Sequence, residues 1–176
     1  PCEARCRRNM IDSAINIRGL KRMAVDNARA NTVPVPEKAE STGKKVAIIG
    51  GGPGGLSAAY YLELMGHHAV VFEEKSKLGG MLRYGIPNFK LPKEVIDRRM
   101  DVLKAEGIRF EMGVPIDVRK LPAGFDAYAV CTGTPTARDL VIPGRELKGI
   151  HFALEMLAWD DDYICLLYTS DAADDK

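Results

Sequence analysis

Hydrophobic residues occur along this chain in short runs that alternate with amphipathic stretches. Residues 46–49 and 69–72 are continuously apolar, as expected of strands that are buried on both faces of a parallel sheet. Two further strands are predicted at 108–112 and 125–130. Residues 56–64 have the pattern of a helix between the first two strands, and Gly66 is suited to end it. This alternation of strand and helix predicts an α/β fold.

A second helix is predicted at 93–106, because four apolar residues recur there at helical spacing. Pro92 suits its first position, N1, since the fixed φ of proline matches the helix. The helix and the strand after it predict a βαβ-like crossover. A short helix or turn is expected at 117–121, and another helix is expected to start within 151–159.

The region before the first strand has a different pattern. Residues 15–30 place apolar side chains at helical spacing, with basic residues on the other face, which predicts a short amphipathic helix with a solvated basic face. Residues 31–43 contain two prolines and a polar run. They predict a linker that is partly extended, because each proline disfavours helix before it.

A glycine-rich turn follows the first strand and opens the next helix. In this G-x-G-x-x-G, Gly50 permits a sharp turn, Gly52 lets the backbone approach a pyrophosphate, and Gly55 lets the helix pack close to the sheet. The helix N-terminus directs N–H groups and a partial positive charge at that pyrophosphate. Glu73, at the end of the second strand, can accept from ribose hydroxyls. The sequence therefore predicts a dinucleotide site. The alternative is a purely structural turn with a solvated Glu73.

The long loop after Glu73 carries a second pair of glycines. Gly79 and Gly80 permit close backbone approach to a ligand, and long loops in compact domains are usually functional. Arg83 and Lys90 in the same loop could reach a phosphate. The alternative for both cations is a solvated surface position, and the sequence leaves Arg83 undecided.

The composition is that of an ordinary globular protein, with 46% hydrophobic and 28% charged residues. A formal net charge of +1 gives no indication of nucleic acid or a membrane surface as partner. No apolar run is long enough to span a bilayer, and no secretory signal is visible. Four cysteines are too few for a disulfide framework, so a cytoplasmic location is expected.

Cys2 and Cys6 stand in C-x-x-x-C spacing beside a cluster of arginines. Thiolates at such spacing suit zinc or an iron–sulfur cluster, but two cannot complete a four-thiolate site. Two interpretations stay open at this point. The favoured one, on these residues alone, is a pair of free thiols. The other is part of a cluster-binding segment whose remaining ligands lie upstream.

Several motifs together resemble one family. The chain is similar to glutamate synthase small subunits and to related flavin- and iron–sulfur-dependent pyridine-nucleotide oxidoreductases. The relatives include the reductase half of dihydropyrimidine dehydrogenase and the large subunit of NADH-dependent ferredoxin:NADP oxidoreductase. The resemblance covers residues 1 to about 158. It is carried by PCEARC at 1–6, VAIIGGGPGGLSAA at 46–59, LGGMLRYGIPNFKLP at 78–92 and TGTPTARDLVIPG at 132–144.

The resemblance implies FAD, and not NAD, on the first glycine fingerprint. It implies pyrophosphate contacts from Gly50, Gly52, Pro53, Gly54 and Gly55, and a ribose contact from Glu73. The flavin's ribityl chain would lie along Gly79, Gly80 and Met81, with Lys90 near the cofactor. Ile116 would hold the adenine through its backbone. Thr132 and Gly133 would form the second place where the chain crosses on the flavin side. Cys2 and Cys6 would be the last two cysteines of an N-terminal 4Fe-4S segment.

The resemblance also implies a domain organisation. Residues 1–30 would be the C-terminal end of a helical iron–sulfur domain, and 31–43 a linker. Residues 44–164 would be an incomplete, three-layer Rossmann-like FAD/NAD(P)-binding domain. The tail at 165–176, CLLYTSDAADDK, looks like a translated sequencing adapter and is left out of the fold prediction. The family's second G-x-G-x-x-G, for NAD(P)H, does not occur, so the chain is interpreted as a fragment truncated at both ends.

The leading hypothesis is part of an oxidoreductase that passes electrons between NAD(P)H, FAD and iron–sulfur clusters. Its partner would be an electron-accepting subunit or domain, for which the glutamate synthase large subunit is one candidate. No acid–base or nucleophile constellation is visible, which fits hydride and electron transfer. No turnover is expected from this chain alone.

The alternative is a non-catalytic dinucleotide-binding module that senses redox state or binds a partner. An NAD-dependent dehydrogenase is disfavoured, because no catalytic His or Lys constellation is present.

Overall fold

The computed structural model describes residues 2–28 and 36–157. Its internal contacts divide the chain into two units, Pro1–Val35 and Pro36–Lys176. The tail at 165–176, for which we predicted an adapter origin, lies outside the described residues.

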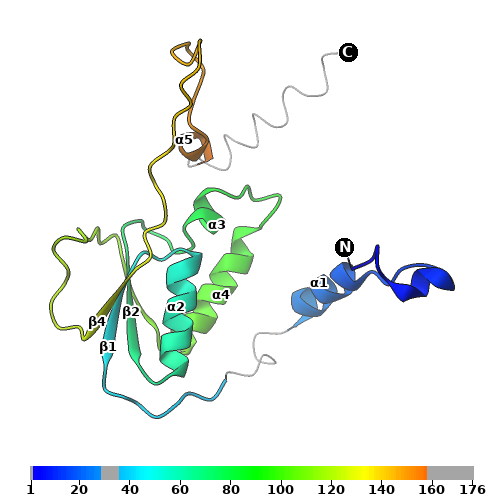
Figure 1. Ribbon diagram of the computed structural model, residues 1–176. Helices are drawn as coiled ribbons and strands as arrows, with labels where there is room; N and C mark the ends of the chain where they lie inside the picture. Colours follow the sequence, from blue (N-terminus) through cyan, green and yellow to red (C-terminus); the bar gives the residue numbers. More distant parts are fainter. Residues whose placement is uncertain (1, 29–35, 158–176) are drawn as a thin grey trace. The chain divides into compact units, whose positions relative to one another are not determined.

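The first unit contains a short 3-10 helix, η1 (Arg7–Met10), and an α-helix, α1 (Ile17–Asn27) (Figure 1). The helix that we predicted at 15–30 is confirmed for Ile17–Asn27. It begins at this point because the Asn16 side chain accepts a hydrogen bond from the Gly19 N–H at 2.8 Å, as an N-cap does. The basic face of α1 is exposed, as expected. The 3-10 helix was not predicted.

The second unit is built on a four-stranded parallel sheet with the strand order β3-β2-β1-β4. The strands are β1 (Lys45–Ile49), β2 (His68–Glu73), β3 (Arg109–Met112) and β4 (Ala127–Val130). All four predicted strands are therefore confirmed, and β1 is central. β4 begins two residues later than predicted, because the Asp126 side chain accepts from the Lys45 N–H at 2.9 Å and ends the ladder.

Within residues 36–157 the second unit has four helices: α2 (Pro53–Leu64), α3 (Met81–Tyr84), α4 (Lys93–Ala105) and α5 (Ala153–Leu157). Gly66 ends α2 as predicted, with φ of +81°, and Gly107 ends α4 with φ of +95°. Pro92 is the N-cap of α4 and not its N1 residue, since its ψ of 134° is extended. Residues 117–120 form a turn, and the single-turn helix α3 was not predicted.

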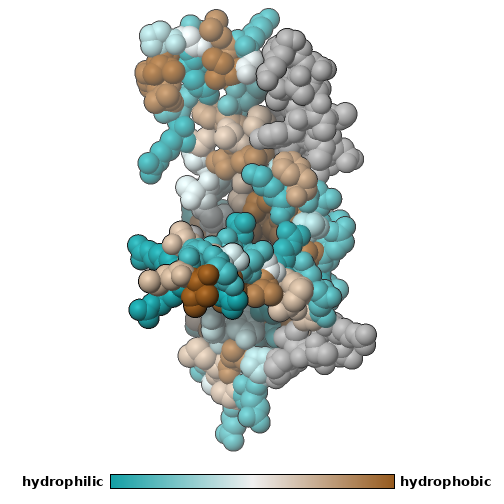
Figure 2. Space-filling model, turned by 90° about the vertical axis from the view of Figure 1, so that its right-hand side faces the viewer, coloured by the Kyte–Doolittle hydropathy of each residue, from teal (hydrophilic) through white to brown (hydrophobic). Residues whose placement is uncertain are grey.

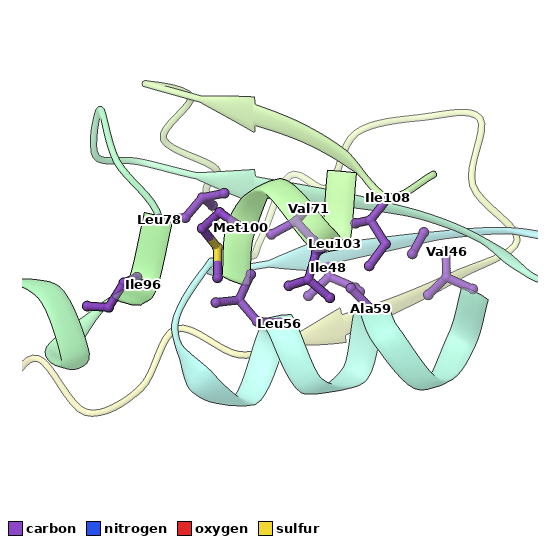
Figure 3. Close-up of a cluster of buried hydrophobic side chains, with 11 residues drawn as sticks. Val46, Ile48, Leu56, Ala59, Val71, Leu78, Ile96, Met100, Leu103 and Ile108 are labelled. Carbon is purple, nitrogen blue, oxygen red and sulfur yellow. The ribbon is translucent and has the colours of Figure 1, made fainter. Parts of the chain in front are cut away.

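The core lies between one face of the sheet and the pair of helices α2 and α4 (Figure 3). Val46 and Ile48 of β1 share this face with Ala69 and Val71 of β2. The helices contribute Leu56, Ala59, Ile96, Met100 and Leu103. On the opposite face, the Phe72 ring meets the Phe125 ring edge-on at 5.8 Å between centroids, and neither α2 nor α4 covers it. The structure thus describes two of the three layers that we expected.

The segment that follows β4 is built differently from the sheet. Its apolar side chains at 140–150 are largely exposed, and none of them belongs to the core cluster. Figure 2 shows hydrophobic residues in separate patches between hydrophilic ones on the face that it presents. Within the described residues, no helix has the length and hydrophobicity needed to cross a bilayer.

Candidate functional site

A cavity of about 700 Å³ lies at the carboxyl ends of β1, β2 and β4. Open parallel sheets bind ligands at this edge, because the loops that leave the strands there enclose a crevice. The walls come from the glycine turn after β1, the end of β2, the start of α3 and the residues after β4. The amino end of α2 lies at this same edge, and a helix N-terminus carries a partial positive charge.

The glycine turn has the geometry that its spacing predicted. Gly50 adopts φ of +110°, and a Cβ there would lie 2.4 Å from the Cys131 carbonyl oxygen. A Cβ on Gly55 would lie 1.9 Å from the Gly50 carbonyl oxygen. Both positions therefore require glycine for the turn and for close packing of α2 on β1. Gly52, the N-cap of α2, lines the cavity with no such contact.

Glu73 is only 7% exposed, which contradicts the alternative of a solvated side chain. Its Oε2 accepts from the Gly51 N–H at 2.7 Å, and its Oε1 accepts from the Lys75 N–H at 2.9 Å. The carboxylate thus joins the end of β2 to the glycine turn. Because each carboxylate oxygen has a second lone pair, Glu73 can still accept from a ligand hydroxyl at the cavity wall.

The second glycine pair packs directly on the first turn. The Gly79 N–H donates to the Gly51 carbonyl oxygen at 2.9 Å, and a Cβ on Gly80 would lie 2.8 Å from the Gly52 Cα. Gly79 and Gly80 have φ of +119° and +50°, a region that favours glycine. Backbone at Gly80 and Gly52 therefore forms two adjoining walls of the cavity.

Most of the site residues implied by the resemblance line this one cavity. They are Gly50, Gly52, Pro53, Gly54, Glu73, Gly80, Met81, Ile116, Thr132 and Gly133. Gly55 and Gly79 do not line the cavity, and they act through packing and the turn. Lys90 is exposed and does not line it either, so the structure does not bring that cation to the site.

Sequence reasoning did not identify several other lining residues. Tyr84, Lys75, Val114, Cys131 and Leu154 all contribute to the cavity wall. The Lys75 ammonium lies 4.1 Å from the centre of the Tyr84 ring, a cation–π contact at the cavity wall. Cys131 directly follows a strand end, a signal that was available in the sequence. Cys131 also packs partly against the core.

The two predicted metal ligands lie in the first unit, where Cys2 is exposed and Cys6 is half-buried. Backbone N–H groups of Ile15 and Arg8 hydrogen-bond to the Cys6 thiol and hold its pKa below the ordinary value. Such bonds favour a thiolate. Across residues 2–28 and 36–157, no three His, Cys, Asp or Glu side chains gather as a metal site.

Comparisons with known proteins agree with this geometry. Residues 48–109 match the model of an NAD(P)-binding Rossmann-like domain. The glutamate synthase [NADPH] small chain of Bacillus subtilis is 43% identical over 164 residues, which is 89% of this chain. The chain is homologous to the glutamate synthase small chains. It spans 33% of the Bacillus small chain and 34% of that of Mycobacterium tuberculosis H37Rv, to which it is 41% identical over 165 residues.

Solved structures support the fold. FprA, an oxidoreductase of Mycobacterium tuberculosis, superposes with a TM-score of 0.60 at 22% identity, over 67% of this chain and 29% of its own. A 2-naphthoyl-CoA reductase superposes with a TM-score of 0.56 at 23% identity, over 70% of this chain and 19% of its own. At such identities the likeness is one of fold. This chain therefore contains a Rossmann-like α/β unit.

Proposed function

We propose that this chain provides the FAD site of an oxidoreductase that passes electrons between NAD(P)H, FAD and iron–sulfur clusters, like a glutamate synthase small chain. The observation that carries the proposal is the cavity itself. It lies between two glycine turns at the carboxyl edge of a parallel sheet, beside a helix N-terminus and a carboxylate. A dinucleotide requires these groups: N–H donors for its pyrophosphate and a carboxylate acceptor for a ribose hydroxyl.

We assign the lining residues to the parts of FAD as the family resemblance implies. Gly52, Pro53 and Gly54, with the first turn of α2, would hold the pyrophosphate, and Glu73 would accept from the adenosine ribose. Gly50, Gly55 and Gly79 would support these contacts by shaping the turns. The adenine would lie at Ile116, and the flavin side at Gly80, Met81, Thr132 and Gly133. FAD supplies the two-electron and one-electron chemistry, while the protein binds and orients it.

Cys2 and Cys6 would be two ligands of a 4Fe-4S cluster in the first unit. The N–H groups that lower the Cys6 pKa favour the thiolate, which is the form that binds iron. Hydrogen bonds to cluster sulfurs also tune the reduction potential of a cluster. The other ligands would come from another segment or chain. Lys90, which is exposed, keeps only a proposed role near the cofactor.

The electron acceptor would be another subunit or domain. The relatives are named as subunits of different enzymes. One is a glutamate synthase small chain, and another is an NADP(+)-dependent formate dehydrogenase subunit beta of Moorella thermoacetica, 33% identical over 172 residues. A glutamate synthase large subunit is one candidate. We also propose a cytoplasmic location, because Cys2, Cys6 and Cys131, the cysteines that the structure describes, form no disulfide.

The proposal is tested by reconstituting the purified chain with FAD, desalting it and recording the visible spectrum. We expect retained flavin that dithionite reduces fully. Glu73→Gln should lose most of the flavin, because an amide nitrogen would face the Gly51 or Lys75 N–H and the ribose would lose an acceptor. Glu111→Gln, on exposed β3, is the matched control and should retain it.

Absence of flavin in the desalted wild-type chain would contradict the FAD assignment. Bound nucleotide without a reducible flavin would favour the non-catalytic module instead. Steady oxidation of NADPH or NADH by this chain alone would contradict our expectation that a separate nicotinamide site is needed.

A further inference from the structure

Arg83 is a buried cation next to the cavity that the proposed function does not use. Its side chain is 7% exposed, and it does not line the cavity wall. Its Nε donates to the Leu78 carbonyl oxygen at 2.6 Å, and its Nη2 donates to Asp97 Oδ1 on α4. Arg83 therefore does not reach toward a phosphate, as the sequence had left open, but joins three segments of the chain.

The Leu78 carbonyl that Arg83 binds directly precedes the second glycine pair. Leu78 is buried in the core with Ile96 and Met100 (Figure 3), and its side chain occupies the space beside Gly51, where a Cβ would lie 2.5 Å from Leu78 Cδ2. The next residue, Gly79, donates to the Gly51 carbonyl oxygen. The anchor for Arg83 is thus the residue at which the second turn meets the first.

Arg83 is also tied to the far side of the same turn. Its own N–H donates to the Gly80 carbonyl oxygen at 3.0 Å, so backbone and side chain of one residue hold both ends of Leu78–Gly80. A buried guanidinium is costly unless its donors are satisfied. Because the Leu78 carbonyl satisfies one of them only while the turn is closed, burial of Arg83 favours the closed turn.

We propose that Arg83 is a positioning residue that holds the turn at Leu78–Gly80 against the glycine turn at Gly50–Gly52. It thereby fixes the separation of the two backbone walls at Gly80 and Gly52. The docking of the turns is a property of the chain itself. The consequence for affinity rests on the proposed function, because it requires FAD in the cavity.

The test is amide hydrogen exchange on the full chain, followed by FAD titration. In Arg83→Gln, the Gly79 amide and the amides of Leu82–Gly85 should exchange at least tenfold faster, while those of β1 and β2 stay unchanged. The FAD dissociation constant should rise at least tenfold, and the increase in melting temperature on adding FAD should shrink. A residue that merely stabilised the fold would lower the melting temperature with and without FAD equally.

Two further variants complete the experiment. Arg98→Gln, an exposed arginine on α4, is the matched control and should match wild type in both measurements. Asp97→Asn keeps an oxygen that can accept from Arg83 but removes the negative charge that pairs with it. Because the Asp97 side chain is 57% exposed, this variant should fold and show a smaller increase in exchange confined to the same loop. If the amides of β1 and β2 also exchange faster in Arg83→Gln, that variant has lost its fold. Exchange of the loop amides in Asp97→Asn then decides whether Arg83 holds the turn.

Unchanged exchange of the loop amides in Arg83→Gln, or in Asp97→Asn where the first variant unfolds, would overturn the inference. So would a loosened loop that binds FAD as tightly as wild type. Failure of the wild-type chain to bind FAD would instead overturn the proposed function, and the exchange of the Gly79 amide would still decide whether Arg83 docks the two turns.

Discussion

Close approach of backbone at Gly55 is the residue-scale feature on which the packing of α2 depends. In Gly55→Ala the new Cβ would lie 1.9 Å from the Gly50 carbonyl oxygen, so α2 must move away from β1. We expect a loss of about 1–3 kcal/mol in the free energy of unfolding, as for other overpacked sites. Gly54→Ala is the control, since no atom lies within 4 Å of its Cβ, and should change stability by less than about 0.5 kcal/mol. Equal stability of the two variants in urea would contradict this prediction.

At the scale of elements, residues 38–42 of the expected linker form hydrogen bonds with the helices of the second unit. Lys38 Nζ lies 2.9 Å from Glu63 Oε2 of α2 and also donates to the Glu106 carbonyl oxygen after α4. The Ala39 N–H donates to the Leu64 carbonyl oxygen at 2.9 Å. Residues 38–42 thus bind along the ends of both helices, although the sequence predicted only a partly extended linker.

This attachment predicts an asymmetric effect of two lysine substitutions. Lys38→Met should lower the free energy of unfolding by about 1.5–3 kcal/mol, because it leaves the buried Glu63 carboxylate without its cation. Lys44→Met, which removes an exposed pair with Asp126, should have a clearly smaller effect. Urea denaturation of both variants provides the measurement, and equal losses would contradict a specific role for Lys38.

The contact between Asp126, just before β4, and the start of β1 predicts that stability depends on pH. The Lys45 N–H, and then the Lys44 ammonium, lower the pKa of Asp126. A carboxyl whose folded pKa is depressed adds stability above its unfolded pKa, about 3.9, and that stability is lost as the pH falls through the lower folded value. Asp126→Asn should therefore lower the melting temperature at pH 7 and differ less from wild type near pH 2. A constant difference across that range would refute the assignment, and Asp101→Asn, an exposed carboxylate, is the control.

For the molecule as a whole, the core cluster among the described residues draws only on residues 46–131. The first unit, Pro1–Val35, contributes no residue to it. We therefore expect residues 36–176, produced without the first unit, to melt at the same temperature as the full chain and to retain FAD equally. A lower melting temperature or loss of flavin in the shorter chain would show that the first unit supports the site.

The strands and helices of the second unit were predictable because their signals are local. Apolar runs mark buried strands, and glycines with positive φ at Gly66 and Gly107 end helices whatever lies around them. The start of β4 and the place of Pro92 were less predictable, since both depend on one hydrogen bond or dihedral angle at an element's end. α3 begins directly after Gly79 and Gly80, where the Gly79 N–H donates to the Gly51 carbonyl oxygen, a contact between residues distant in sequence.

The resemblance to a family, and not a local pattern, implied the cavity residues Met81, Ile116, Thr132 and Gly133. The sequence by itself determined the α/β class and the glycine turn with its acid at the next strand. These features depend on neighbours or on a spacing that a single strand–helix–strand unit imposes. Only the tertiary structure decided the roles of the cations: Arg83 is buried against Leu78 and Asp97, Lys38 binds Glu63, and Lys90 stays exposed. A charged side chain has the same local pattern in each case, and its partners lie up to 68 residues away, so burial and pairing are settled only when the chain has folded.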